Sequence, residues 1–425
     1  MNNNGTLVEV HKSQTYSTIW YHVGVIDKNN KRINWGPSYQ YDDGVHPSIA
    51  ITDDNFVIEV HKSETWGTLW QRVGTVDTNN KTINFSASSQ FDNGQRPSVA
   101  CAFNGSMAIQ THQSQTFTTL WSSTSLITNG SDWMGDHLSV LGNKTLKEIA
   151  LPASHDSGMY IGGLDPAVLG KTQVLNIYEQ LSYGIRYYDL RPYWDGSDFY
   201  IYHGFDFIKG PKLSEVLADI QKFMNEGHRE VAIFKFSHYN SFSNDIYKKM
   251  VDAIQSSLGQ WLFTTLPSNT RLADIPLNDY VRDGGKALVV CDEDYPVNNP
   301  RSGFWVYRDW SSTTANKGDL RVFDVYSNTT DYETMKNDQL QKFKDYNGKC
   351  KHDPNLPCDL FLLSWTLTPI TFVWEFSKVA NKNLASVITQ VANPNSHGCY
   401  LNLVYLDYVE FARVTDVTLI MNGLV

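Results

Sequence analysis

LSEVLADIQKFMNEGHREVAIFKF, residues 213–236, places a helix pattern directly before a strand pattern and decides the fold class. Apolar residues recur at helical spacing from Leu213 to Met224, which predicts a helix with one apolar face. EVAIFKF, at 230–236, is a short apolar run typical of a strand buried on both faces. A helix followed by such a strand is the unit of α/β folds with parallel sheets.

Seven further apolar runs of strand length lie along the rest of the chain, separated by segments long enough for helices. The eight predicted strands are KEIALPAS (147–154), IRYYDLRP (185–192), DFYIYHG (198–204), EVAIFKF (230–236), KALVVCD (286–292), LRVFDVY (320–326), DLFLLSWT (359–366) and LNLVYLDY (401–408). Eight β/α units over roughly 290 residues are what a closed barrel requires. We therefore predict a distorted (β/α)8 TIM-type barrel at 132–425, with its chemistry at the carboxyl ends of the strands.

The preceding segment, residues 1–128, repeats itself about every 50 residues. VEVHKSQTYSTIW at 8–20 returns as IEVHKSETWGTLW at 58–70 and as AIQTHQSQTFTTLW at 108–121. Runs rich in β-branched and aromatic residues alternate with turn signals such as DKNNK and FDNG, which predicts about four strands per repeat. We expect an all-β module, either lectin-like or propeller-like.

Aromatic and polar residues recur at fixed positions of these repeats, and two interpretations are open. If exposed, they would bind a glycan or a membrane surface; otherwise they pack between the strands. The repeated histidines, His11, His61 and His112, show no cysteine or carboxylate partner at fixed ligand spacing, so the pattern disfavours a metal role for them.

Charge and hydropathy exclude some functional classes. Lys and Arg number 35 against 45 Asp and Glu, a formal net charge of -10 without any basic run, which disfavours binding to nucleic acid. No apolar stretch of about 18 residues occurs, so we expect no transmembrane segment. The start MNNNGTLVEV lacks a signal-peptide pattern, and both a cytoplasmic and a secreted protein remain possible. Cys350 and Cys358 flank a short loop that a disulfide would close.

Polar side chains gather where the predicted barrel strands end. They are His155, Asp156, Asp189, Arg191, His203 and Asp407. One histidine can remove the proton of a hydroxyl next to a phosphodiester, a second can protonate the leaving oxygen, and a cation can neutralise the phosphoryl oxygens. Each residue alone is compatible with a structural role, but together they predict metal-free phosphodiester chemistry.

Three of these segments resemble a known family. LPASHDSGMY at 151–160, QLSYGIRYYDLRPYWDG at 180–196 and IYHG at 201–204 are similar to the catalytic X-box of phosphatidylinositol-specific phospholipase C. The resemblance implies that His155 is the general base and His203 the general acid. It also implies that Asp156 supports the acid and that Asp407 orients the base.

The resemblance also indicates a branch of the family. Calcium-dependent members carry carboxylates at both polar positions of the second motif, whereas this chain has Asp189 and Arg191, as metal-independent bacterial members do. Phe236 and Ser237 stand where a metal-binding Glu is expected. We therefore expect no metal and no other cofactor.

FDVYSNTTD, at 323–331, is similar to the headgroup-binding segment of the bacterial enzymes. This implies that Asp324 bonds the inositol hydroxyls and that Tyr326 lies against the ring. Two departures weaken the inositol prediction: Cys291 and Asp292 stand where a headgroup Arg is expected, and Phe236 stands near an expected Lys.

The resemblance implies cleavage of phosphatidylinositol, or a glycosylated form of it, by attack of the inositol 2-hydroxyl. The products would be diacylglycerol and a cyclic inositol phosphate, and the β module would help the protein to dock on a membrane. Two alternatives remain open: a related phosphodiesterase for another phospholipid headgroup, and a glycan-binding protein whose barrel is inactive.

Overall fold

The computed structural model describes residues 1–424 apart from eleven short gaps. These gaps are 53–54, 86–87, 103–106, 127–129, 162–169, 205–207, 299–302, 310–316, 353–359, 370–371 and 392–400. The chain divides into two compact units, Met1–Thr128 and Asn129–Leu424. Cys358 and the side chain of Cys350 lie outside the described residues, so the disulfide stays a prediction.

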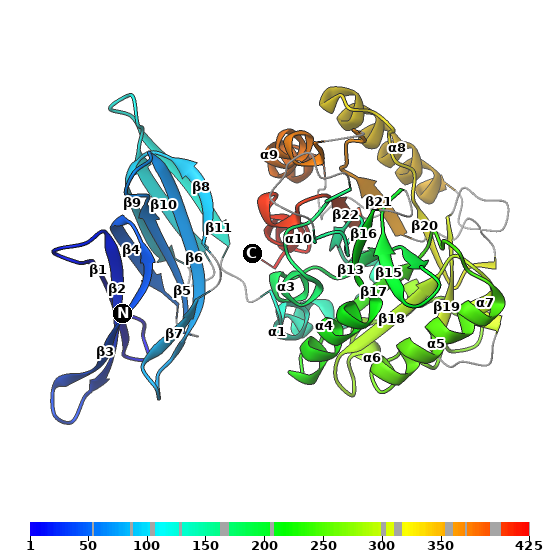
Figure 1. Cartoon of the computed structure of the whole chain (residues 1–425), viewed down its shortest axis with the longest axis horizontal. Helices are drawn as coiled ribbons and strands as arrows, with labels where there is room; N and C mark the ends of the chain where they lie inside the picture. Colours follow the sequence, from blue (N-terminus) through cyan, green and yellow to red (C-terminus); the bar gives the residue numbers. More distant parts are fainter. Residues whose placement is uncertain are drawn as a thin grey trace. The chain divides into compact units, whose positions relative to one another are not determined.

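The second unit contains a closed barrel of eight parallel strands, which confirms the predicted fold class (Figure 1). In barrel order the strands are β12 (Leu151–Ser154), β13 (Tyr187–Leu190), β17 (Val231–Phe236), β18 (Lys286–Cys291), β19 (Phe304–Asp309), β20 (Leu320–Phe323), β21 (Leu360–Ser364) and β22 (Leu403–Leu406). The last strand pairs with the first, so the sheet has no free edge.

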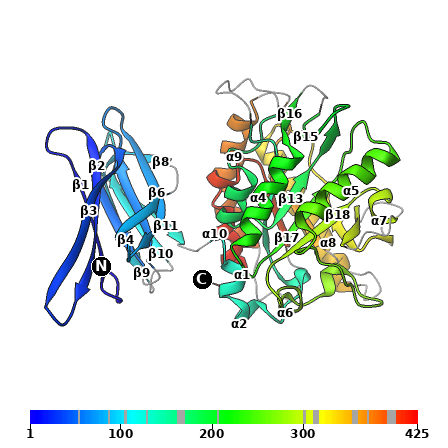
Figure 2. The same ribbon diagram turned by 60° about the horizontal axis from the view of Figure 1, so that its bottom comes forward.

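Helices lie outside this ring of strands (Figure 1, Figure 2). They are α1 (Trp133–Asp136), α2 (Leu138–Leu141), α3 (Ile177–Tyr183), α4 (Leu213–Asn225), α5 (Asn244–Leu258), α6 (Leu277–Tyr280), α7 (Tyr295–Asn298), α8 (Tyr332–His352), α9 (Val373–Val391) and α10 (Val414–Met421). Helix α4 matches the predicted helix, and its apolar face is buried in the core. Among the described residues, no helix is both long and apolar enough to cross a membrane.

One predicted barrel strand is wrong. The segment 198–204 forms β15 (Phe199–Tyr202), which lies between β14 (Pro192–Trp194) and β16 (Lys209–Lys212) in a separate antiparallel sheet. Buried and partly exposed residues alternate along β15, a pattern typical of a strand with one solvated face rather than of a barrel strand. The strand that completes the barrel is β19, which sequence analysis missed because its end, YRD, is polar.

Side-chain alternation along β17 decides which residues face the barrel interior. Ile233 packs in the cluster that fills the barrel, whereas Phe234 and Phe236 pack in the cluster between the strands and the helices. Lys235 has the parity of Ile233 and is therefore directed inward. This places a buried cation inside the barrel.

All the elements described in the first unit are strands, as the repeats predict. They are β1 (Thr6–Lys12), β2 (Thr18–Asp27), β3 (Arg32–Asp43), β4 (Val45–Ile51), β5 (Phe56–Lys62), β6 (Thr68–Asp77), β7 (Thr82–Phe85), β8 (Ser89–Asn93), β9 (Gln95–Ala102), β10 (Met107–Gln113) and β11 (Leu120–Leu126). They form three antiparallel sheets, in which β4 pairs with β5 and β9 with β10. The last strand of one repeat thus joins the sheet of the next.

The expectation that the repeated histidines lack carboxylate partners is wrong. His11 contacts Glu9, and His61 contacts Glu59, with 3.0 Å between a ring nitrogen and a carboxylate oxygen in each pair. Residues two apart on a strand share a face, so this i, i+2 spacing is the signal that was overlooked. His112 instead has a carboxylate oxygen of Asp92 at 3.4 Å from its Nε2.

Candidate active site

Arg191 lies at the centre of the polar cluster, one residue after β13. Its Nε is 2.6 Å from a carboxylate oxygen of Asp156, and its Nη2 is 2.8 Å from one of Asp189. Asp189 also accepts hydrogen bonds from the hydroxyls of Tyr405 (2.7 Å) and Ser237 (3.2 Å). The guanidinium is therefore held between two buried carboxylates, one of which is fixed by further donors.

His155 follows the first barrel strand, β12, and contacts the end of the last barrel strand, β22, which pairs with β12. Its backbone N–H donates to the carbonyl of Leu406 in β22, and its Nδ1 lies 2.7 Å from an oxygen of Asp407. Donation of Nδ1–H to Asp407 leaves Nε2 directed toward Arg191, whose Nη2 is 3.2 Å away. The ring is thus oriented with one nitrogen facing the centre of the cluster.

The electrostatic surroundings of His155 favour its charged form. Burial lowers the pKa of His155, but the carboxylates of Asp156 and Asp407 outweigh this effect and raise it to about 9. Burial alone would raise the pKa of Asp156, yet Arg191 and the neighbouring histidines hold it below its usual value. The cluster therefore keeps its carboxylates ionised.

His203 reaches the cluster from the small antiparallel sheet rather than from the barrel. The N–H of Tyr202, at the end of β15, donates to the carbonyl of Arg191 at 3.0 Å, which fastens this sheet to the end of β13. His203 Nδ1 forms a short contact with a carboxylate oxygen of Asp156. The structure thus brings both predicted histidines to one carboxylate, because His155 Nε2 is 3.5 Å from the same oxygen.

Asp156 has an unusual backbone conformation, with φ of 39°. This left-handed region is unfavourable for a residue with a Cβ, and such strain is concentrated at functional sites. The conformation lets one buried carboxylate contact Arg191 and both histidines. Asp156 is therefore the residue that joins the three groups.

The cluster does not fit a calcium site. Ligand atoms of His155, Asp156 and Asp189 lie within 4.8 Å of one another, close enough to suggest a metal centre. However, the Arg191 guanidinium forms ion pairs with both carboxylates and brings its own positive charge to the place where an ion would bind. A calcium ion also requires six to eight oxygen ligands, and Ser237 offers a hydroxyl where a carboxylate would be needed.

A second charged group lies further along the barrel. Lys235 Nζ is 2.8 Å from a carboxylate oxygen of Asp324, which also accepts a hydrogen bond from Tyr307 at 2.8 Å. Burial lowers the pKa of Lys235, but the charge of Asp324 outweighs burial and raises that pKa. Lys235 and Asp324 therefore form an ion pair. Asp324 thus lies inside the barrel, beside a cation that the sequence analysis did not select.

The residues near the predicted headgroup site differ in where their side chains lie. Lys235 pairs with Asp324, whereas Phe236 packs in the core toward the helices. The side chain of Cys291 is buried in the same core. Tyr326 is 55% exposed, and no contact that the structure gives among the described residues joins it to Asp324. Its role against a sugar ring stays a prediction.

Lys235 and Tyr405 are the members of the cluster that sequence reasoning missed. Each is a polar residue at the inward parity of an otherwise apolar, fully buried strand. That isolated polar position was the available signal. The alternation of side chains along a strand identifies such residues only when it is known which face points into the barrel. That knowledge comes from the structure of the closed barrel.

Comparisons with known proteins place similar sequences and a similar fold beside this barrel. Residues 159–282 match the family model described as phosphatidylinositol-specific phospholipase C, X domain. The match contains Asp189, Arg191 and His203, whereas His155 and Asp407 lie outside it.

Two curated relatives illustrate the similarity. A PI-PLC X-box domain-containing protein of Dictyostelium discoideum is 26% identical over 222 residues, covering 48% of this chain and 28% of the relative. The 1-phosphatidylinositol phosphodiesterase of Listeria monocytogenes is 30% identical over 150 residues, covering 35% of this chain and 45% of the relative. The alignments thus span less than half of either relative.

A solved structure, the phosphatidylinositol-specific phospholipase C from Listeria monocytogenes, shares the fold. It aligns with a TM-score of 0.52 and 20% sequence identity, covering 68% of this chain and 98% of that one. The fold and the cluster define a TIM-type barrel with an arginine between carboxylates and histidines at its strand ends. The barrel is thus similar in sequence to the X domain of phosphatidylinositol-specific phospholipase C, as the motifs predict, and similar in fold to the Listeria enzyme.

Proposed function

We propose that the barrel cleaves phosphatidylinositol, or a glycosylated form of it, by attack of the inositol 2-hydroxyl on the phosphodiester. The products are diacylglycerol and a cyclic inositol phosphate. The observation that carries this proposal is the placement of Arg191 between Asp156 and Asp189, with two carboxylate-bound histidines, His155 and His203, that both contact Asp156. The Listeria relative, named a 1-phosphatidylinositol phosphodiesterase, supports the choice of substrate.

In this mechanism His155 Nε2 accepts the proton of the 2-hydroxyl as that oxygen bonds to phosphorus. Asp407 holds the opposite ring nitrogen at 2.7 Å and stabilises the imidazolium that forms. Because the pKa of His155 is raised to about 9, the neutral form that accepts the proton becomes more abundant as the pH rises toward that value.

His203 donates a proton to the diacylglycerol oxygen as the bond from this oxygen to phosphorus breaks. Its Nδ1 is held by Asp156, so the other ring nitrogen is the donor. Arg191 neutralises the charge that grows on the non-bridging oxygens, the role that a metal ion fills in calcium-dependent relatives. One proton enters His155 and one leaves His203, so the step is balanced.

Asp324 and Tyr326 are the proposed contacts of the inositol ring, and Lys235 sets the charge of Asp324. The ion pair keeps the Asp324 carboxylate ionised, which makes it a strong acceptor for sugar hydroxyls. Tyr326 is exposed and would have to contact a bound ring from the solvent side.

Phosphorus NMR of the products from a panel of phospholipid vesicles tests the barrel proposal. A cyclic inositol phosphate from phosphatidylinositol is the expected signal, and His155→Ala is the matched control. Cleavage of another headgroup alone would favour a related phosphodiesterase. No product from any lipid would favour the alternative of an inactive barrel.

We further propose that the β module binds a lipid surface. Tyr16, Trp66 and Phe117 occupy the same hairpin position in the three repeats, and their exposed fractions are 69%, 71% and 70%. Consecutive hairpins are joined by hydrogen bonds, from Ser17 to Glu64 and from Gln115 to the carbonyl of Gly67. Three protruding aromatic side chains therefore lie on adjacent hairpins of the module.

A serine hydroxyl braces each of these hairpins. The backbone N–H groups of Tyr16, Trp66 and Phe117 donate to Ser13, Ser63 and Ser114, respectively. Protruding aromatic rings of different types suit a lipid interface better than a glycan site, which requires directed hydrogen bonds around one ring. By contrast, Trp20 and Trp70 are partly buried and donate to Thr18 and Thr68 within their own strands.

Vesicle sedimentation tests this second proposal. Replacing Tyr16, Trp66 and Phe117 with Ser should weaken binding to phosphatidylinositol vesicles and leave cleavage of a short-chain soluble substrate unchanged. Equal vesicle binding by the triple variant would overturn the proposal. Loss of binding to a glycan array, with vesicle binding retained, would assign the hairpins to a sugar ligand.

A further inference from the structure

In each repeat, one strand carries a Glu or Gln followed two residues later by a His. The residue paired with that Glu or Gln on the neighbouring strand differs from repeat to repeat. The pair is Glu9–His11, Glu59–His61 and Gln110–His112, and the residues across from the first member are His22, Arg72 and Ser123. The same place in the repeat therefore offers three different sets of side chains. Comparing them shows what each can bind.

In the second repeat, the side chains at these positions belong to a buried ionic network. Glu59 is fully buried and contacts His61, while Asp42 contacts Arg72 at 2.7 Å and lies 3.8 Å from the His61 ring. Tyr41 also donates to Glu59 at 2.9 Å. The guanidinium of Arg72 supplies the positive charge that pairs with Asp42 in this network.

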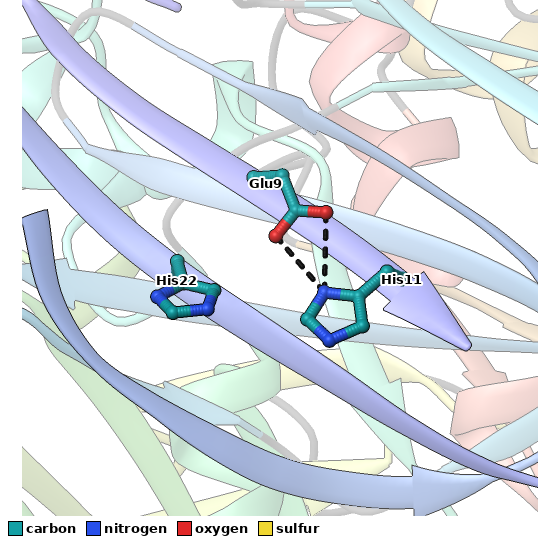
Figure 3. A group of neighbouring side chains, drawn as sticks. All are labelled: Glu9, His11 and His22. Carbon is teal, nitrogen blue, oxygen red and sulfur yellow. Dashed lines mark hydrogen bonds and ion pairs between the residues drawn. The ribbon is translucent and has the colours of Figure 1, made fainter. Parts of the chain in front are cut away.

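In the first repeat a histidine replaces that arginine. Glu9 and His11 lie on β1 and His22 lies on β2, and the two carboxylate oxygens of Glu9 face the His11 ring (Figure 3). The rings of His11 and His22 are stacked, with centroids 5.8 Å apart. Two imidazoles and one carboxylate thus meet on the surface without a permanent cation among the three.

The hydrogen-bond geometry leaves ligand nitrogens available. Nδ1 of His22 is 3.3 Å from the carbonyl oxygen of Gly36, so donation by Nδ1–H leaves the lone pair on Nε2. A backbone carbonyl that fixes the tautomer in this way is the usual second partner of a metal-binding histidine. Nδ1 of His11 faces both carboxylate oxygens of Glu9, so a metal ion that replaces the proton between them would bind this nitrogen and the carboxylate together.

We propose that Glu9, His11 and His22 form a binding site for a divalent transition metal, with Zn²⁺ as the best fit. Ligand atoms of the three residues lie within 4.8 Å of one another. Zinc takes histidine nitrogen and carboxylate oxygen at about 2 Å, so the ligands must approach by about 1 Å. Side chains that are 42% and 45% exposed, as in His11 and Glu9, can make this movement.

The ion would join β1 to β2 just before the hairpin that carries Tyr16. Glu9 and His22 are direct partners in the strand register, so a shared ligand would act as a clamp across the pair. Three protein ligands leave one position of a tetrahedral ion for water or an external group. The site is independent of the proposed barrel chemistry.

Calorimetric titration of the full chain with Zn²⁺ tests the site. We expect one saturable event that His22→Arg and His11→Ala weaken at least tenfold and that Glu9→Gln weakens less. His22→Arg copies the second repeat and Glu9→Gln copies the third, so both variants retain residues that the fold already accepts. His46→Asn, which removes another exposed histidine of the module, is the matched control and should bind as the wild type does.

A second readout separates binding at this site from binding elsewhere. Zinc should raise the thermal unfolding midpoint of the wild type and of His46→Asn, but not that of His22→Arg. Zinc bound by the barrel cluster would persist in all four variants. Equal affinity in wild type and His22→Arg, or no saturable event in the wild type, would overturn the proposal.

Discussion

The barrel cluster around His155 and the module cluster around His11 contain the same kinds of side chain but differ in what balances their charge. In the barrel, Arg191 bonds two carboxylates and fills the centre. In the module, His22 stands where the second repeat has Arg72, and no arginine is bonded to the Glu9–His11 pair among the described contacts.

One residue, an arginine or a histidine, therefore determines what a histidine–carboxylate cluster can bind. An arginine brings a permanent charge and five donors, so it neutralises anions without an ion and repels cations. A histidine is neutral when deprotonated and offers a lone pair, so it recruits a metal instead. We therefore expect the barrel to be active without metal and the module to bind one.

Removing Arg191 is the change with the largest expected effect. Arg191→Ala should lower turnover of phosphatidylinositol by about two to five orders of magnitude, because the phosphoryl charge is then unopposed. Arg191→Lys should recover only part of the loss, since one ammonium cannot make the forked contact. Initial rates on vesicles, measured with chelator present, give both values.

Arg191→Asp tests whether the guanidinium is what distinguishes the barrel cluster from the module cluster, because this variant has no guanidinium at the centre. Beside Asp156 and Asp189 the new carboxylate should create a weak calcium requirement. Near-normal activity of Arg191→Ala in chelator would show that the guanidinium does not have the proposed role.

The two histidines come next in expected effect. His155→Ala and His203→Ala should each lower turnover by about two to four orders of magnitude, the usual contribution of a positioned acid or base. Their combined loss should be less than the product of the single losses, because both act in one step. Circular dichroism of each variant checks the fold, and a variant with normal rates would leave the mechanism without that residue.

The barrel could be predicted because most of its strands are apolar runs and polar motifs follow several of them directly in the sequence. His155, Asp156, Asp189 and Arg191 lie within or immediately after barrel strands, so their convergence follows from the fold. His203 was assigned correctly to the cluster, but its strand, β15, was wrongly assigned to the barrel. That strand belongs to a separate antiparallel sheet, which a hydrogen bond from Tyr202 to Arg191 fastens to the end of β13. Local pattern contains no information about such a bond.

The remaining parts were missed for related reasons. Lys235 is recognisable only from the parity of β17 in a closed barrel. The module cluster depends on the register that places His22 opposite Glu9, and pairing between strands is not visible in the spacing of one strand. Both Lys235 and the module cluster depend on contacts between strands, which the sequence of a single strand does not show.

A smaller effect is expected from Asp407→Asn. Removing this carboxylate removes one cause of the raised pKa of His155, so that pKa should fall below about 9. The base is active when neutral, so the acidic limb of the kcat/KM profile should move to lower pH. The maximal rate should fall less than in His155→Ala, and an unmoved limb would show that Asp407 does not act on the base.

The smallest expected effect on turnover is that of His22→Arg. Converting the module cluster into the arginine form should leave cleavage of a soluble substrate unchanged, with or without zinc. The measurement is the initial rate at saturating substrate, with His46→Asn as the control. A loss of rate would mean that the module contributes to the chemical step.

The decisive measurement is the activity of the unmodified protein in excess chelator. We predict that phosphatidylinositol is cleaved to a cyclic inositol phosphate at the same rate with chelator as with added calcium, because Arg191 supplies the charge. Loss of activity in chelator, with recovery on addition of calcium, would contradict it.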